Sequence, residues 1–397
     1  MEPSARKAFN AQFTDEKYRR FLESLNKGLA KPIEFRVAET PVFLTDDFRD
    51  NLLSAGKDII DVILQPDFKQ LTDTAIPEKW NVANENDHPH FIALDFGVCK
   101  DEHGAIVPKL IELQGFPSLY GFQVHLADTY RKSFDIPDDW TIFFGQLDKK
   151  GYLELLKKTI VGPYHPDEVV LMDVNAPDQK TAVDFYITQG YLGIPVLALD
   201  ELIEQNGKLY YESRGAYKPI KRIYNRLIFD EIEGDPDIFD KVVDIRKHLD
   251  VEWITHPNWF YRVSKFTMPF LKGGYVPKTM FLNELGTIPD GLENYVLKPL
   301  FSFAGQGVII DVTEEDIKKI KDPENWILQE KVNYDPVVHA PDGRVKLEIR
   351  LLYLWPDGDA EPTLAVNLAR LSRGKMIGVR YNKDFDWVGG TVAFMRK

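Results

Sequence analysis

Three side chains near residue 100 have the chemistry to bind a metal ion: Asp95 in FIALDFGV, and Glu112 and Gln114 in LIELQG. The two segments flank a polar turn at 101–104, which predicts a β-hairpin with Asp95 opposite about Leu110. Because side chains alternate along a strand, the three residues would share one face. Two carboxylates and an amide oxygen suit a hard cation such as Mg²⁺. A solvated polar face is the alternative, but Glu112 within an apolar run favours a charged or metal partner.

Two lysines in the second half of the chain have the chemistry to bind phosphate. Segment 294–311, NYVLKPLFSFAGQGVIID, predicts a β-hairpin with Lys298 on its incoming strand and small residues at its tip. Glycines let backbone N–H groups approach an anion, and a lysine supplies a point charge to phosphate oxygens. Lys265 lies upstream in a predicted helix at 261–271. By itself the hairpin favours an ordinary glycine-rich turn, so its meaning depends on the other residues.

The middle of the chain predicts a small parallel sheet. Within 168–232, two apolar strands flank a helix, which is typical of a strand–helix–strand unit. Asn225 and Arg226 lie where such sheets bind ligands, although a polar turn and a surface salt bridge explain them at least as well. Ser118 and Tyr120, in the loop GFPSLYGFQ, border either a substrate pocket or a plain connection. The first strand is not followed by G-x-G-x-x-G, which argues against a dinucleotide site.

Composition narrows the classes of partner. The 397 residues carry a net charge of −13, which argues against nucleic acid and against an anionic membrane surface. The single cysteine, Cys99, excludes an internal disulfide and fits a reducing compartment. The first residues contain no apolar signal-peptide core, and no later run is long enough to span a bilayer. We therefore expect a cytoplasmic protein with small-molecule partners.

The order of these elements resembles the ATP-grasp fold. Lys265 is followed by Lys298 with its small-residue loop, and then by the predicted strand ILQEKV. Ordinary ATP-grasp proteins carry their metal-binding residues after that strand, whereas here Asp95, Glu112 and Gln114 come before it. The inverted order resembles the circularly permuted ATP-grasp enzymes, in particular the synthetase domain of glutathionylspermidine synthase.

The resemblance implies an ATP- and Mg²⁺-dependent ligase that joins a small peptide-like or amino-acid substrate to an amine through an acyl phosphate. Lys265 and Lys298 would hold the phosphates, and the hairpin of Asp95 would hold magnesium. The implied lid loop and adenine-binding strand comprise Ala304, Gly305, Gln306, Gly307, Gln329, Glu330, Lys331 and Val332. Arg370, in NLAR, resembles the family's late arginine at the transferring phosphate. Arg350, which shares a face with Glu348 on the preceding predicted strand, is a second catalytic candidate.

The resemblance also predicts how the chain is organised. We expect a mainly helical segment at 1–90, hairpin strands of the ATP-grasp core at 91–165, a small α/β substrate lobe at 166–255 and a nucleotide-binding portion at 256–397. Two residues depart from the family pattern, Gln114 in place of Asn and Ala93 in place of an arginine. Gln still offers an amide oxygen. The departures keep open a catalytically inactive ATP-binding module with a regulatory or partner-binding role. An ATP-dependent kinase of a small molecule is a further alternative, because the same contacts to ATP would permit phosphoryl transfer to a hydroxyl.

Overall fold

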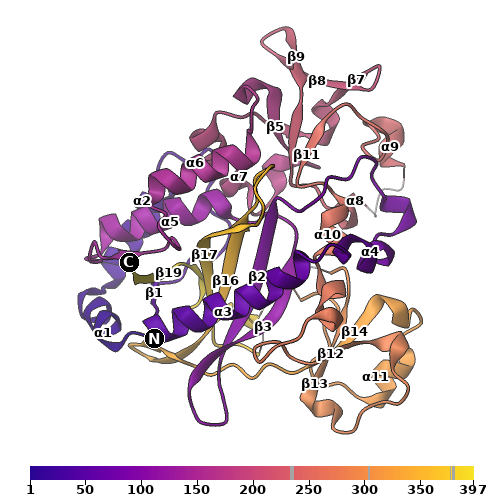
Figure 1. Ribbon diagram of the computed structural model, residues 1–397. Helices are drawn as coiled ribbons and strands as arrows, with labels where there is room; N and C mark the ends of the chain where they lie inside the picture. Colours follow the sequence, from indigo (N-terminus) through magenta and orange to yellow (C-terminus); the bar gives the residue numbers. More distant parts are fainter. Residues whose placement is uncertain (233–236, 303–304, 376, 378–380) are drawn as a thin grey trace.

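A six-stranded sheet crosses the middle of the molecule (Figure 1). The computed structural model describes residues 1–232, 237–302, 305–375, 377 and 381–397. The strands of this main sheet are β2 (Phe91–Lys100), β3 (Ile106–Gln114), β15 (Val338–Ala340), β16 (Gly343–Leu354), β17 (Thr363–Ser372) and β18 (Gly389–Thr391). The predicted β2–β3 hairpin and the predicted antiparallel pair β16–β17 are both confirmed. Strand β2 also pairs with β16, so the early and late strands form one sheet.

One face of the main sheet is apolar and lies under helix α3 (Asp46–Ile63). Apolar residues at helical spacing, including Phe48 and Leu52, pack on the side chains that β2 and β16 direct to this face. The helix crosses the sheet closely at Gly56, where an added Cβ would lie 2.3 Å from the hydroxyl oxygen of Tyr353. A larger residue at this helix position would therefore force the Tyr353 side chain to shift.

The opposite face of the main sheet changes from apolar to polar along its strands. Phe91 and Ala93 on β2, with Leu352 and Leu354 on β16, join a second core under α5 (Tyr120–Ser133) and α2 (Asp15–Asn26). Further along the same face the next β2 side chain is Asp95, which marks the end of the apolar core. The candidate site begins where this core ends.

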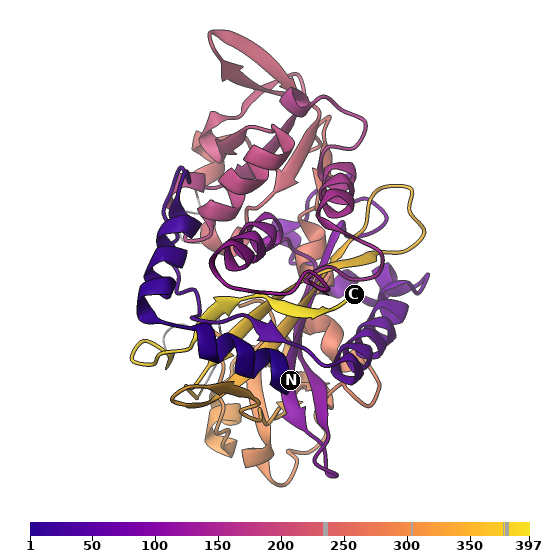
Figure 2. The same cartoon turned by 90° about the vertical axis from the view of Figure 1, so that its left-hand side faces the viewer.

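A four-stranded parallel sheet forms the lobe at the top of Figure 1. Its order is β11-β10-β5-β6, and its elements are β5 (Val169–Asp173), α7 (Ala182–Leu192), β6 (Val196–Ala198), β10 (Arg222–Asn225) and β11 (Glu252–Ile254). The predicted parallel sheet is confirmed. An antiparallel ribbon of β7 (Ile203–Gln205), β8 (Lys208–Ser213) and β9 (Ala216–Ile220) projects from this lobe in both Figure 1 and Figure 2.

A three-stranded antiparallel sheet of order β12-β14-β13, here called the small sheet, lies at the lower right of Figure 1. Its elements are β12 (Thr279–Phe281), β13 (Tyr295–Pro299) and β14 (Trp326–Glu330), with helix α11 (Glu314–Lys319) beside them. The second arm of the predicted hairpin pairs only through a bridge between Leu297 and Ile309. The helix predicted at 261–271 is interrupted. It consists of α10 (Asn258–Arg262) and a 3₁₀ helix, η6 (Lys265–Phe270), because the Ser264 side chain caps the second piece.

The segment before residue 90 contains helices and one short strand. Strand β1 (Val42–Phe43) pairs in parallel with β19 (Ala393–Arg396), which also pairs with β4 (Trp140–Thr141). The remaining helices are α1 (Pro3–Gln12), α4 (Phe68–Leu71), α6 (Lys149–Ile160), α8 (Phe229–Ile232) and α9 (Ile238–Lys241). Within the described ranges, no helix has the length and apolar character needed to cross a bilayer.

Candidate active site

Asp95 is the centre of the candidate site. It lies on β2 between Glu112 of β3 and Arg350 of β16, its partners in the sheet register. Arg350 binds the carboxylate with two parallel hydrogen bonds: Nε donates to Oδ1 at 2.6 Å and Nη2 donates to Oδ2 at 2.6 Å. Asp95 is 2% exposed. A bidentate, charge-assisted contact is the arrangement that can keep such a buried carboxylate ionised.

Arg370 adds a second cation to the same carboxylate. It lies on β17 opposite Glu348 of β16, donates from Nη2 to Asp95 Oδ2 at 2.8 Å and forms an ion pair with Glu348. Burial opposes the ionisation of Asp95, but Arg350 and Arg370 outweigh it and hold the pKa of Asp95 below its ordinary value. The Arg370 side chain is 34% exposed, against 8% for Arg350. Arg370 is therefore the more exposed of the two guanidinium groups that bind Asp95.

Glu348 is the third carboxylate of the site. Burial raises its pKa in spite of Arg370, and the nearby charge of Asp95 acts in the same direction as burial. The hydroxyl of Tyr334 donates to Glu348 Oε2 at 2.7 Å. Sequence reasoning missed Tyr334, because its position over the main sheet depends on the path of the loop after β14.

A β-bulge in the hairpin delivers a backbone carbonyl to Lys298. Asp95 pairs with Glu112 and Phe96 pairs with Leu110, so Ile111 has no partner in the ladder. This corrects the expectation that Asp95 would lie opposite Leu110. Lys298 Nζ donates to the freed carbonyl oxygen of Ile111 at 2.9 Å. The bulge thus connects the hairpin of the predicted metal ligands to the predicted phosphate-binding lysine.

The two predicted lysines are buried and close to each other. Lys298 is 8% exposed and Lys265 is 7% exposed. Burial lowers the pKa of Lys298 to about 8; Glu112 opposes this shift and Lys265 adds to it. Lys265 Nζ donates to the carbonyl oxygen of Ser302 at 2.9 Å, which ties η6 to the segment after β13.

These side chains form one group, here called the polar cluster. Its members are Asp95, Glu112, Glu348, Lys265, Lys298, Arg350 and Arg370. When all of them are ionised, the four cationic groups outnumber the three carboxylates by one. A buried cluster with excess positive charge attracts an anion such as a polyphosphate. Residues that are far apart in the sequence are therefore brought together as the metal and phosphate predictions require.

The fit of the cluster to magnesium is best at two of the three predicted ligands. Glu112 and Gln114 are half-buried and lie two residues apart on one face of β3. Both Asp95 oxygens accept from arginines, which makes Asp95 less available to a metal ion than Glu112 and Gln114. Protein sites commonly hold Mg²⁺ through one or two carboxylates plus substrate phosphates. Among the residues described, no group of three His, Cys, Asp or Glu is placed to hold a metal.

The predicted adenine strand and lid loop lie on the small sheet. Gln329 is 1% exposed on the central strand β14, and Glu330 Oε2 accepts from the backbone N–H of Lys278 at 3.1 Å. Lys331 and Val332 follow the strand and are half-buried. Gly305, Gln306 and Gly307 form an exposed turn in which both glycines have positive φ, as the lid prediction requires. Ala304 lies outside the described residues.

Arg226 is packed against aromatic rings at the carboxyl end of β10. It is 5% exposed, and its guanidinium carbon lies 5.1 Å from the ring centre of Phe116 and 5.0 Å from that of Phe185. Its Nε and Nη1 find no hydrogen-bond partner in the described part of the chain. Burial raises the pKa of Asp173 and of Asp184, and Arg226 opposes both shifts. The surface salt bridge considered for Arg226 is therefore wrong.

Asp173 and Asp184 are site residues that the sequence reasoning missed. Asp184 is fully buried in α7; its Oδ1 accepts from the Phe122 N–H at 2.9 Å, while Oδ2 has no partner among the described residues. Asp173 ends strand β5 and is 2% exposed. The available signal was a lone aspartate inside the apolar run AVDFYI, since a buried charge there requires a partner.

The other predicted substrate residues differ in their accessibility. Tyr120 is fully buried and its hydroxyl lies 3.0 Å from the carbonyl oxygens of Ile92 and Tyr353, so the structure places it in the core and corrects the prediction. Asn225 is 1% exposed, and its side chain donates to the carbonyl oxygen and accepts from the N–H of Leu227. Ser118 is half-buried in the loop before α5 and stays a candidate.

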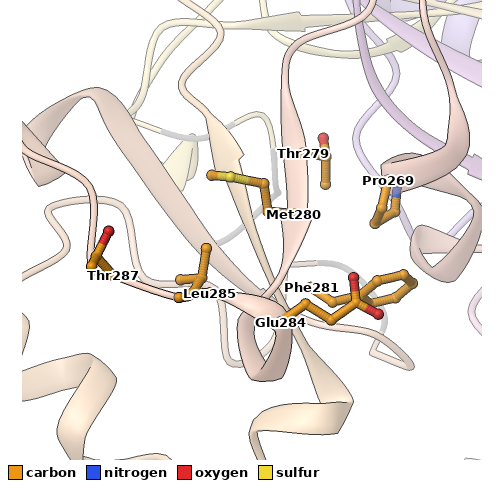
Figure 3. Close-up of a pocket in the computed structure, with 8 residues that line it drawn as sticks. Pro269, Thr279, Met280, Phe281, Glu284, Leu285 and Thr287 are labelled. Carbon is orange, nitrogen blue, oxygen red and sulfur yellow. The ribbon is translucent and has the colours of Figure 1, made fainter.

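A hollow of about 580 Å³ opens beside the edge strand β12 (Figure 3). It is lined by Pro269, Thr279, Met280, Phe281, Glu284, Leu285, Gly286 and Thr287. None of these residues belongs to the polar cluster, so the hollow by itself does not identify the candidate active site. It does reach Thr279, which pairs with Gln329 in the small sheet.

Comparisons with known proteins identify the fold. No protein-family model matches the chain, and a comparison with curated proteins gave no match. Among solved structures, a glutathione synthetase-like effector (GSS30) from Globodera pallida, in its apo form, is similar with a TM-score of 0.61 and 12% sequence identity. The similarity covers 96% of each chain. At this identity the likeness shows the fold alone: the chain has a mixed α/β, glutathione synthetase-like fold, as expected of an ATP-grasp relative.

Proposed function

We propose that the protein is an ATP- and Mg²⁺-dependent ligase of the circularly permuted ATP-grasp type. It joins the carboxylate of a small amino-acid or peptide-like substrate to an amine. The observation that carries the proposal is the contact between the two halves of the predicted site, in which Lys298 bonds to Ile111 beside Glu112. The order of the chain supports permutation, because β2 and β3 precede the small sheet although they share the main sheet with β16 and β17.

The polar cluster supports a defined division of roles. Lys265 and Lys298 bind phosphate oxygens of ATP, and the excess positive charge of the cluster favours the bound anion. Glu112 and Gln114 hold Mg²⁺, which when bound neutralises charge on the phosphates. Arg370, the more exposed arginine, is free to leave Asp95 and meet the transferring phosphate, while Arg350 keeps Asp95 paired.

The unpaired buried groups at Arg226 and Asp184 support an acid that also carries an ammonium group. The unpaired guanidinium nitrogens suit a carboxylate, and the unpaired oxygen of Asp184 suits an ammonium. Asp173 adds a second carboxylate at the same carboxyl edge of the parallel sheet. An α-amino-acid headgroup satisfies both charges at once, which favours an amino acid or peptide as the acid substrate.

The reaction then proceeds in two steps. An oxygen of the substrate carboxylate attacks the γ-phosphorus of ATP, forming an acyl phosphate as ADP leaves. The amine nitrogen attacks the acyl carbon, phosphate leaves, and the nitrogen loses a proton to give the amide. The turn at Gly305–Gly307 is suited to cover the acyl phosphate and exclude water.

A screen of paired acids and amines tests the proposal. The protein is incubated with Mg²⁺-ATP and pools of amino acids, dipeptides and amines, while ADP, phosphate and new masses are measured. We expect ADP and phosphate in equal amounts, and an amide mass, only when an acid and an amine are both present. Arg226→Met should keep ATP binding but lose the ADP release that depends on the acid. Arg20→Met, at an exposed position on α2, should behave as wild type.

An inactive ATP-binding module remains a second candidate, because both oxygens of Asp95 are held by arginines. ATP binding without ADP release in every pool would favour that module. A phosphorylated hydroxyl compound in place of an amide would favour the kinase.

A further inference from the structure

The backbone that carries Lys265 consists of short pieces. Helix α10 has five residues, and η6, which begins at Lys265, is a 3₁₀ helix of six residues that contains Pro269. Helices of this length are not stable by themselves in water, so contacts with other segments must fix where Lys265 lies. Many of the contacts of α10 come from segment 69–86, which precedes the main sheet in the sequence.

Arg262, the last residue of α10, is tied to segment 69–86 through all three of its guanidinium nitrogens, and it is 4% exposed. Its Nε donates to Glu85 Oε1 at 2.7 Å, and its Nη2 donates to Glu85 Oε2 at 3.1 Å and to Asp73 Oδ1 at 2.7 Å. Its Nη1 donates to the carbonyl oxygen of Lys69 at 2.5 Å. Burial opposes the ionisation of Glu85, but hydrogen bonds from Arg262 and Asn258 outweigh it and hold the pKa of Glu85 below its ordinary value.

Two residues at the start of α10 bond to the same segment. Asn258 is 2% exposed and donates from Nδ2 to Glu85 Oε2 at 2.9 Å. Trp259 Nε1 donates to Asn86 Oδ1 at 2.8 Å. Glu85 therefore bonds to both ends of α10, so its carboxylate fixes the position and the direction of this helix.

Two further hydrogen bonds connect the end of α10 to the helix of Lys265. The carbonyl oxygen of Arg262 accepts from Thr267 Oγ1 at 2.6 Å, and that of Val263 accepts from the N–H of Gly115, just after β3, at 2.7 Å. Because Thr267 is fully buried within η6, a shift of Arg262 would move η6 and with it the ammonium group of Lys265.

We propose that Arg262 and Glu85 are positioning residues that hold Lys265 at the phosphates of the nucleotide. Neither residue belongs to the polar cluster, and both act through the backbone of η6. Segment 69–86 is thereby required for phosphate binding although it lies outside the candidate active site. The inference rests on the proposed function, because it requires Lys265 to bind phosphate.

Calorimetric titration with Mg²⁺-ATP, and with adenosine as a ligand that lacks the phosphates, tests this role. Glu85→Gln keeps the size of the side chain but removes its charge, so the affinity for ATP should fall about tenfold while the affinity for adenosine stays unchanged. Asp244→Asn is a matched control, because Asp244 forms the same bidentate contact with Arg246 and its side chain is 13% exposed, against 12% for Glu85. This control should bind ATP as the wild type does.

A double variant separates positioning from a general effect on the fold. Lys265→Met should itself bind ATP about tenfold more weakly than the wild type. If Glu85 acts through Lys265, adding Glu85→Gln to Lys265→Met should cause no further loss, whereas independent effects would multiply. Arg262→Lys keeps the charge but cannot bind Glu85 with two parallel bonds, so it should lose ATP affinity in the same way as Glu85→Gln.

The possible results separate the two proposals. Wild-type affinity for ATP in both Glu85→Gln and Arg262→Lys, equal losses for ATP and adenosine, or multiplied losses in the double variant would overturn the positioning role and leave the ligase proposal standing. Failure of the wild type to bind ATP would overturn both.

Discussion

Replacing Lys298 by methionine should abolish a proton uptake that accompanies ATP binding. Burial lowers the pKa of this lysine from its ordinary value of 10.5 to about 8. The difference corresponds to about 3.5 kcal/mol against the charged form, at about 1.4 kcal/mol per pKa unit. The folded protein therefore holds this proton less tightly than the unfolded chain. The contribution of Lys298 to the free energy of unfolding therefore rises as pH increases from about 8 to 10.5. This gain is lost as pH falls back through the same range.

Bound ATP reverses this shift, because its phosphates stabilise the ammonium. At pH 8 about half of the Lys298 side chains in the free protein are neutral, so binding should take up about half a proton per nucleotide. If the pKa returns to its ordinary value in the complex, the affinity for ATP should fall about tenfold between pH 7 and pH 9.

Calorimetry in two buffers of different ionisation enthalpy measures this uptake directly. Lys298→Met should bind ATP more weakly at pH 7 and show no buffer-dependent heat. Lys109→Met is a matched control, because this lysine lies on β3 and, like Lys298, donates to a backbone carbonyl oxygen, that of Gly274. An unchanged proton uptake in Lys298→Met, or none in a wild type that binds ATP, would refute the reasoning.

Two further predictions concern the stability of the fold. Arg350→Met should lower the free energy of unfolding by about 3–5 kcal/mol in denaturant titration, since Asp95 would keep a buried charge without its bidentate partner. The double variant Asp95→Asn/Arg350→Met should recover part of this loss, and no recovery would contradict the explanation. Asp357 is half-exposed and its pKa is lowered to about 2, because the hydrogen bond from His90 outweighs burial. The stability that Asp357 contributes is present above about pH 4 and is lost as pH falls through 2. Asp357→Asn should therefore lower the free energy of unfolding by about 1 kcal/mol at pH 7, and the stability of the variant should depend less on pH between 4 and 2.

Period-two alternation was sufficient to predict the central part of the site. It placed Asp95 and Glu112 on one face of a hairpin, and the structure has them opposite each other. The long apolar strands β16 and β17 were equally predictable, because few other structures suit such runs. These features depend on local pattern alone.

Features that depend on register or tertiary contact could not be predicted. The bulge at Ile111 changes which residue faces Asp95, and no local signal marks an extra residue in a strand. The bonds from Arg350 to Asp95 require β2 and β16 to be neighbours, which alternation cannot show. The burial of Tyr120 could not be predicted, because it depends on packing in the core under α5 and on hydroxyl contacts to carbonyl groups of two distant strands.

The central place of β2 in the main sheet has a consequence for synthesis in the cell. Asp95 and Arg350 are separated by 255 residues, so the ribosome needs about 13–50 s to deliver the partner at 5–20 residues per second. During that interval one edge of the apolar strand β2 is unpaired, and the side chain of Asp95 has no arginine partner. An exposed apolar edge is a template for aggregation. Yield in a host should therefore depend on chaperones that shield the nascent hairpin until its late partner strand emerges.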